Sequence, residues 1–119
     1  IAYGTILENA IQASKILKEE DNLNLTIVDA RFAKPFDEEL FIKLAQENEI
    51  LITIEEGAIG GFGSAVNQFL NDKGLLDGKC KFRSLFMADK FIEHGDVSKM
   101  QEEAGIGVGN IVELVRNFK

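Results

Sequence analysis

The alternation of short apolar runs with helical patterns constrains the fold of this chain more than any other feature. Residues 25–30, "LTIVDA", are β-branched and continuously apolar up to Asp29. Residues 49–56, "EILITIEE", have the same character. Runs without polar alternation are typical of strands buried on both faces, as in parallel sheets covered by helices.

Between these runs, apolar residues recur at the spacing of amphipathic helices. Asp37 is suited to cap one helix at its start, and Gly74 is suited to end another. The pattern predicts strands at residues 1–4, 25–30, 49–56 and 79–87, and helices at 5–20, 38–48, 64–74, 96–105 and 109–118. Such alternation with short connections implies an α/β domain with a mostly parallel sheet covered on both faces.

Length and charge limit the classes of function. The 119 residues suit one domain, and no run is apolar and long enough for a membrane span. The net charge of −7 disfavours binding to nucleic acid or to anionic membranes. Cys80 is the single cysteine, so an internal disulfide is excluded and a reducing, cytoplasmic location is expected. The chain begins with Ile1 in strand-like sequence, which favours a domain cut from a larger protein.

The glycine-rich stretch "EEGAIGGFGSAV", residues 55–66, lies between a predicted strand and a predicted helix. It matches neither the dinucleotide-binding spacing nor a nucleotide-binding P-loop, which needs a lysine. A helix N-terminus can hold an anion, but Glu55 and Glu56 would oppose one at close range. We therefore interpret Gly60, Gly61 and Gly63 as a structural turn that packs the helix against the strand.

No residue pattern predicts a catalytic or metal site within this chain. Glu55 and Glu56 are adjacent on a predicted strand, so their side chains are expected to point to opposite faces and cannot form a catalytic carboxylate pair unless the strand ends between them. One of them is suited to accept hydrogen bonds from amides of the turn. His94 is the single histidine and has no nucleophile beside it in the sequence.

Polar residues follow the predicted strands at the carboxyl edge of the sheet, where open parallel sheets carry their sites. We expect Arg31, Glu55, Glu56 and His94 to cluster on one rim there, because they are too polar for a core. Our hypothesis is that this rim docks against other domains, with Arg31 pairing one of the glutamates.

Three stretches together resemble a known family. "VDARFAKPFDEEL" (residues 28–40), "TIEEGAIGGFGSAV" (53–66) and "DKFIEHGD" (89–96) resemble motifs of the C-terminal domain of the 1-deoxy-D-xylulose-5-phosphate synthases, a transketolase-like family. The likeness covers nearly the whole chain. Two departures affect the carboxyl edge: the glycine loop has one residue fewer than the family pattern, and Ala88 stands where the family usually has proline.

The resemblance implies a three-layer α/β/α domain with a roughly five-stranded, mostly parallel sheet, and allows an antiparallel first strand. It implies the third domain of a three-domain, thiamine-diphosphate-dependent enzyme that joins pyruvate to glyceraldehyde 3-phosphate with loss of carbon dioxide. In that family the other domains bind thiamine diphosphate and Mg²⁺, so this chain is expected to bind neither. It is expected to contact those domains and to support a homodimer.

Two alternatives to an excised, non-catalytic domain stay open. The chain could be the small subunit of a split transketolase-like enzyme, active only with a partner chain. It could also be a stand-alone anion-binding, regulatory module that uses the glycine turn. Upstream coding sequence would separate the first alternative from the domain reading, and titration with phosphate ligands would test the second.

Overall fold

The described part of the chain is built on a small parallel sheet. The computed structural model describes residues 1–3, 6–30, 37–56, 61–86 and 105–118. Within them, three strands pair in the order β1-β2-β3: β1 is Ala2–Tyr3, β2 is Ile50–Glu55 and β3 is Lys81–Leu85. Both pairings are parallel, so the allowance for an antiparallel first strand is wrong. The α/β class and the mostly parallel sheet are confirmed.

The predicted strand at residues 25–30 is only partly formed. It contributes one isolated parallel bridge, between Asp29 and Ala2, and residues 22–28 have no regular secondary structure. The two hydrogen bonds beside this bridge run from the Ala2 amide to the Val28 carbonyl (2.8 Å) and from the Ala30 amide to the Ala2 carbonyl (2.9 Å). β1 therefore lies between this segment and β2.

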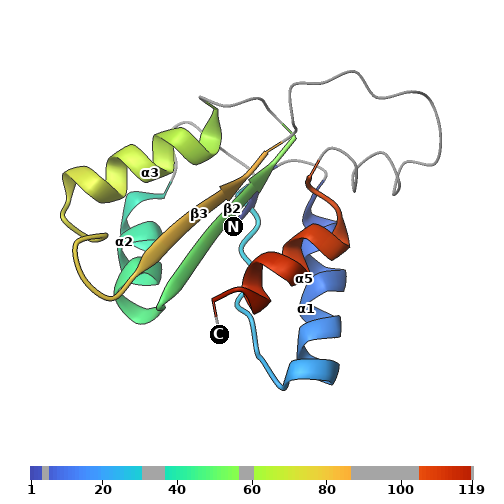
Figure 1. Cartoon of the computed structure of the whole chain (residues 1–119). Helices are drawn as coiled ribbons and strands as arrows, with labels where there is room; N and C mark the ends of the chain where they lie inside the picture. The colour runs from blue at the N-terminus through green and yellow to red at the C-terminus, as the bar shows by residue number, and fades with distance from the viewer. Residues whose placement is uncertain (4–5, 31–36, 57–60, 87–104, 119) are drawn as a thin grey trace.

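Helices lie on both sides of the sheet (Figure 1). On one side are α2 and α3, and on the other are α1 and α5. Their bounds are Leu7–Asp21 for α1, Glu38–Glu47 for α2, Phe62–Asp72 for α3 and Val108–Arg116 for α5. The predicted helix at residues 96–105 lies almost wholly outside the described residues.

Two helix ends follow the sequence prediction. The Asp37 side chain accepts a hydrogen bond from the Leu40 amide (3.1 Å) and caps α2. Gly74 follows the C-cap of α3 with φ of +70°, a left-handed conformation that glycine adopts without steric cost. The Leu75 amide then bonds back to the Leu70 carbonyl (3.0 Å), which closes the helix end in a Schellman arrangement.

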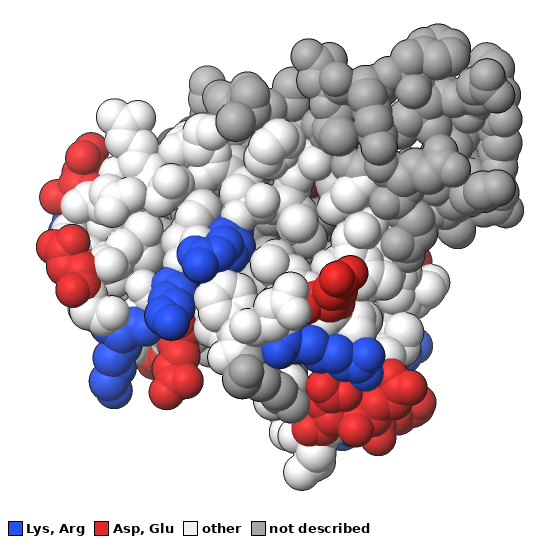
Figure 2. Space-filling model, viewed as in Figure 1, with Lys and Arg blue, Asp and Glu red and all other residues white. Residues whose placement is uncertain are grey.

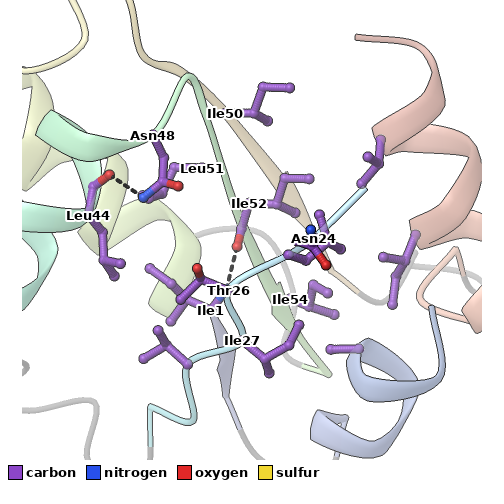
Figure 3. Close-up of a pocket in the computed structure, with 15 residues that line it drawn as sticks. Ile1, Asn24, Thr26, Ile27, Leu44, Asn48, Ile50, Leu51, Ile52 and Ile54 are labelled. Carbon is purple, nitrogen blue, oxygen red and sulfur yellow. Dashed lines mark hydrogen bonds between the residues drawn. The ribbon is translucent and has the colours of Figure 1, made fainter. Parts of the chain in front are cut away.

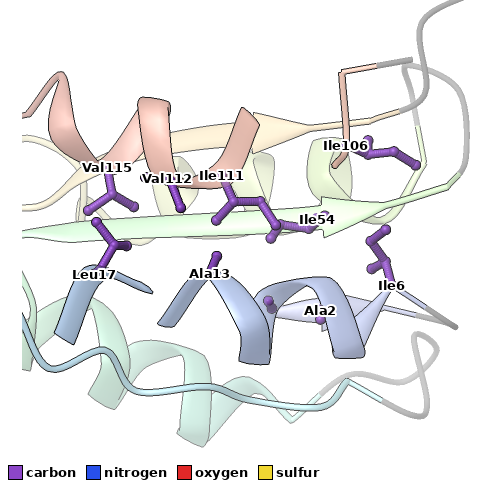
Figure 4. Close-up of a cluster of buried hydrophobic side chains, with 10 residues drawn as sticks. Ala2, Ile6, Ala13, Leu17, Ile54, Ile106, Ile111, Val112 and Val115 are labelled. Atoms are coloured by element: carbon purple, nitrogen blue, oxygen red, sulfur yellow. The ribbon is translucent and has the colours of Figure 1, made fainter. Parts of the chain in front are cut away.

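Each side of the sheet has its own apolar cluster. In the first, Ala13 and Leu17 of α1 face Ile111 and Val115 of α5, and Ile54 of β2 lies next to Ile111 (Figure 4). In the second, buried side chains of α2 and α3 cover the opposite face; they include Phe41, Leu44, Val66 and Leu70. Burial of both faces explains why the sequence of β2 is apolar without alternation.

Ion pairs join the far ends of the two helices that cover the first cluster. The Arg116 guanidinium of α5 lies 2.8 Å from a carboxylate oxygen of Glu20 and 2.8 Å from one of Asp21, at the end of α1. The hydrogen bonds to Asp21 and then to Glu20 raise the pKa of Arg116. Figure 2 shows acidic side chains gathered with a basic one at this corner. Such exposed pairs contribute little to stability.

None of the described helices has the length and apolar character needed to cross a bilayer.

Candidate functional site

The carboxyl edge of the sheet brings together the end of β1, the end of β2 and the start of α3. Tyr3 and Glu55 pair in register at the last positions of their strands. The chain then turns into α3, which begins at Phe62. This is the edge where the sequence predicts a rim of polar side chains.

The side chain of Glu55, the last residue of β2, lies at the N-terminus of α3. It is buried, with 3% of its surface exposed. One carboxylate oxygen accepts from the Phe62 amide (3.0 Å) and the other from the Gly63 amide (2.5 Å). The expectation that every rim candidate is too polar for the core is wrong for Glu55, because two charge-assisted hydrogen bonds and the helix dipole compensate its burial.

This arrangement bears directly on anion binding. The glutamate supplies, from within the chain, the negative charge that a helix N-terminus attracts. The amides of Phe62 and Gly63 already donate to it and do not point at open solvent. A phosphate at these amides would have to displace a buried carboxylate.

Gly63 lies directly against the sheet, where β2 and β3 pair. A Cβ atom added at Gly63 would lie 2.2 Å from the Ser84 hydroxyl and 2.8 Å from the Thr53 hydroxyl. These two hydroxyls come from paired positions of β2 and β3 and lie 3.3 Å apart. The glycine is therefore needed for space. Gly61, at the N-cap of α3, has φ of −87°, outside the left-handed region, and Gly60 lies outside the described residues.

An aromatic group lies beside this turn. The rings of Tyr3 and Phe62 stack with their centroids 5.2 Å apart, and the Phe41 ring meets Phe62 edge-on at 6.1 Å. Tyr3 is 37% exposed and is the one exposed large hydrophobic residue in the described part of the chain. The sequence analysis missed this group, because residues from three separate elements build it.

Of the other three rim candidates, only Glu56 lies among the described residues. Glu56 is exposed and follows Glu55 at the end of β2. Arg31 and His94 lie outside the described residues. The clustering of the four side chains on one rim therefore stays a prediction. The Glu55 carboxylate itself is directed into the domain, toward the start of α3.

Groups with chemical reactivity are few among the described residues. The Cys80 thiol is buried just before β3, and burial raises its pKa, which disfavours the reactive thiolate. Within the described ranges, no three His, Cys, Asp or Glu side chains are grouped so that they could hold a metal ion.

Comparison with known proteins gives one family match. The family model described as "Transketolase, C-terminal domain" matches residues 1–111. A probable 1-deoxy-D-xylulose-5-phosphate synthase 2, chloroplastic, of Oryza sativa subsp. japonica is 45% identical over 115 residues, which cover 97% of this chain and 16% of that protein.

Two further relatives carry similar names. A probable 1-deoxy-D-xylulose-5-phosphate synthase, chloroplastic, of Capsicum annuum is 43% identical over 118 residues, 99% of this chain and 16% of that protein. The 1-deoxy-D-xylulose-5-phosphate synthase 1, chloroplastic, of Cannabis sativa is 44% identical over 117 residues, 98% of this chain and 16% of that protein. The chain thus spans about one sixth of the length of the curated relatives it matches.

Proposed function

Because the chain belongs to the transketolase C-terminal domain family, we propose that it is the C-terminal domain of a 1-deoxy-D-xylulose-5-phosphate synthase. The whole enzyme would condense pyruvate with glyceraldehyde 3-phosphate, with loss of carbon dioxide. The observation that carries this proposal is identity of 43–45% with named synthases over nearly the whole chain. The motifs around residues 28–40, 53–66 and 89–96 support the same assignment.

Within that enzyme we assign this chain a supporting role. Thiamine diphosphate needs a site for its pyrophosphate and the accompanying Mg²⁺. The described residues do not fit such a site. The amides at the start of α3 already donate to the Glu55 carboxylate, and the described ranges contain no group of His, Cys, Asp or Glu side chains that could hold a metal ion. The other domains would hold the cofactor and its chemistry, and this domain would pack against them in a cytoplasmic or plastid homodimer. The complete domain would have three layers and roughly five strands.

The same geometry weighs against the alternative of an anion-binding module. A free phosphate or phosphorylated ligand would compete with the Glu55 carboxylate for the Phe62 and Gly63 amides. The negative charge of the chain, −7, adds general repulsion. The capped N-terminus of α3 is equally compatible with a small subunit of a split enzyme. The coding sequence upstream of Ile1 distinguishes that alternative from a domain of a single-chain synthase.

We predict that the 119-residue chain alone binds no thiamine diphosphate and forms no 1-deoxy-D-xylulose 5-phosphate. The complete gene product, supplied with thiamine diphosphate and Mg²⁺, is expected to form it. Titration calorimetry of the chain with thiamine diphosphate and Mg²⁺ tests the first statement, and a coupled product assay tests the second. Micromolar binding to the chain would overturn the supporting role, and an inactive complete protein would overturn the synthase assignment.

A second prediction concerns the rim. In the complete protein, Glu56→Ala and His94→Ala are each expected to lower activity while this domain stays folded, because we place both residues where the domain meets the cofactor-bearing domains. Glu113→Ala, at an exposed position of α5, is the control. Steady-state kinetics and the melting temperature of each variant are compared. Full activity in both rim variants would remove the docking hypothesis.

A further inference from the structure

Three basic side chains lie together at one edge of the described sheet, in a chain whose net charge is −7. They are Lys79, Lys81 and Arg83, all exposed, and we call them the basic stripe. Two of them belong to β3, the last strand in the order β1-β2-β3, so within the described residues no strand covers its outer side. Figure 2 shows basic side chains in a row over this part of the molecule.

Lys81 and Arg83 share one face of β3, because side chains two residues apart on a strand point to the same side. Their register partners in β2 are Ile50 and Ile52, which point toward the side of α1 and α5, whereas Leu51 points the other way (Figure 3). On that side both basic residues are exposed, so α5 does not cover them.

The Arg83 side chain is held in a defined position. Its guanidinium lies over the Phe118 ring, 5.0 Å from the centroid, and one terminal nitrogen donates to the Phe82 carbonyl (2.7 Å). An arginine side chain has five N–H donors, and this bond uses one of them. A guanidinium fixed in this way is suited to bind a carboxylate through two parallel hydrogen bonds, with little further loss of side-chain freedom.

The basic stripe differs from basic residues on the helices in its acidic neighbours. Lys43 of α2 lies four residues from both Glu39 and Glu47, the spacing at which side chains meet on a helix. Residues 78–86, in contrast, contain no acidic residue. The ion pairs found in the described part of the chain also include none with a member of the basic stripe.

The charge of this edge specifies the character of a partner. Pairing with the same edge of a second copy would set one basic stripe against another, and like charges on neighbouring strands repel. A complementary surface must carry carboxylates, which an ordered arginine and two lysines attract and orient.

We propose that the basic stripe is a docking surface for an acidic segment in the other domains of the complete protein, with Asp or Glu side chains against Lys81 and Arg83. This surface follows the side of the sheet and differs from the rim at its carboxyl edge, where Glu56 lies. The proposal rests on the assignment of this chain as one domain of a larger protein, and not on the reaction of that protein.

Zero-length cross-linking of the complete gene product tests the contact. A carbodiimide joins a lysine amine to a carboxylate where the two groups touch, and mass spectrometry identifies the linked residues. We expect links from Lys79 or Lys81 to Asp or Glu residues outside residues 1–119. Links that end only within residues 1–119, such as at Glu49 before β2 or in a second copy, would overturn the proposal. The absence of any link from the two lysines would also overturn it.

The rate of lysine acetylation measures coverage of the same surface independently. In the complete protein at low salt, Lys79 and Lys81 are expected to react about fivefold or more slowly than Lys43, an exposed lysine of α2. The difference should largely disappear at about 1 M NaCl, because charges are then screened within about 3 Å. Equal rates at low salt, or slow rates that salt does not change, would overturn docking by charge.

A charge reversal with a matched control completes the test. Lys81→Glu in the complete protein should raise the acetylation rate of Lys79 to that of Lys43, because the acidic segment is then repelled. Lys18→Glu, at an exposed position of α1, should leave Lys79 slow. Equal effects of the two variants would overturn the proposal. Product formation by the unmodified protein is assayed separately, so its absence would contradict the synthase assignment and not the docking surface.

Discussion

Replacing Gly63 by valine is expected to lower the free energy of unfolding of the chain by about 3 kcal/mol, with a fall in melting temperature of roughly 10 °C. The first added atom alone would lie 2.2 Å from the Ser84 hydroxyl and 2.8 Å from the Thr53 hydroxyl. Thr53 is fully buried and cannot swing out, so α3 would have to move off the sheet. Urea denaturation followed by circular dichroism measures the effect.

Gly78 offers the matched control. It has open space around it, since nothing lies within 4 Å of an added Cβ atom, and Gly78→Val should change stability by less than about 0.5 kcal/mol. A double-mutant cycle localises the clash: Ser84→Ala should recover part of the loss caused by Gly63→Ala, because it removes the nearest atom. Equal effects at Gly63 and Gly78 would contradict close packing of α3 on the sheet.

The glycine turn shows what sequence reasoning can reach. The spacing excluded the two nucleotide-binding patterns and left a packing role, which agrees with the geometry of Gly63. It did not identify which glycine is indispensable, because that depends on the strand positions under the helix. Thr53 is a polar residue within the apolar run of β2, and it was the one local sign of a polar contact under the helix.

The two adjacent glutamates show a similar division. One of the two was expected to accept from amides of the turn, and Glu55 does so. The strand ends at Glu55, so the alternation of strand side chains does not extend to Glu56, which is exposed. Which of the two turns inward depends on the register of β2 with β1 and on where α3 begins. Neither can be read from a local pattern.

The strand at residues 25–30 illustrates a limit of another kind. Its composition indicated a buried strand, but a strand also needs a hydrogen-bonded neighbour along its length. Among the described residues its strand pairing is limited to the bridge between Asp29 and Ala2, and residues 22–28 have no regular secondary structure. The composition of a segment indicates whether it is buried. Regular strand pairing depends in addition on a neighbouring strand from another part of the sequence.

Replacing Glu55 by glutamine is expected to cost about 2–3 kcal/mol of stability, although the two side chains have nearly the same shape. The carboxylate accepts from both the Phe62 and the Gly63 amide. A glutamine side chain has one carbonyl oxygen, so its NH₂ group would face one of these buried donors and leave it without an acceptor. The charge that complements the α3 dipole would also be lost.

An exposed glutamate elsewhere in the domain makes this test specific. Glu113→Gln removes the same charge from an exposed position of α5 and should change the free energy of unfolding by less than about 0.5 kcal/mol. Amide exchange measured by NMR adds a local readout: Phe62 and Gly63 should exchange faster in Glu55→Gln, whereas the Leu40 amide, capped by Asp37, should not change. Equal losses from the two glutamine variants would mean that general charge, and not the cap on α3, determines the effect. Slow exchange at Phe62 and Gly63 in Glu55→Gln would show that the protection of these amides does not depend on the Glu55 carboxylate, and would contradict its role as the cap of α3.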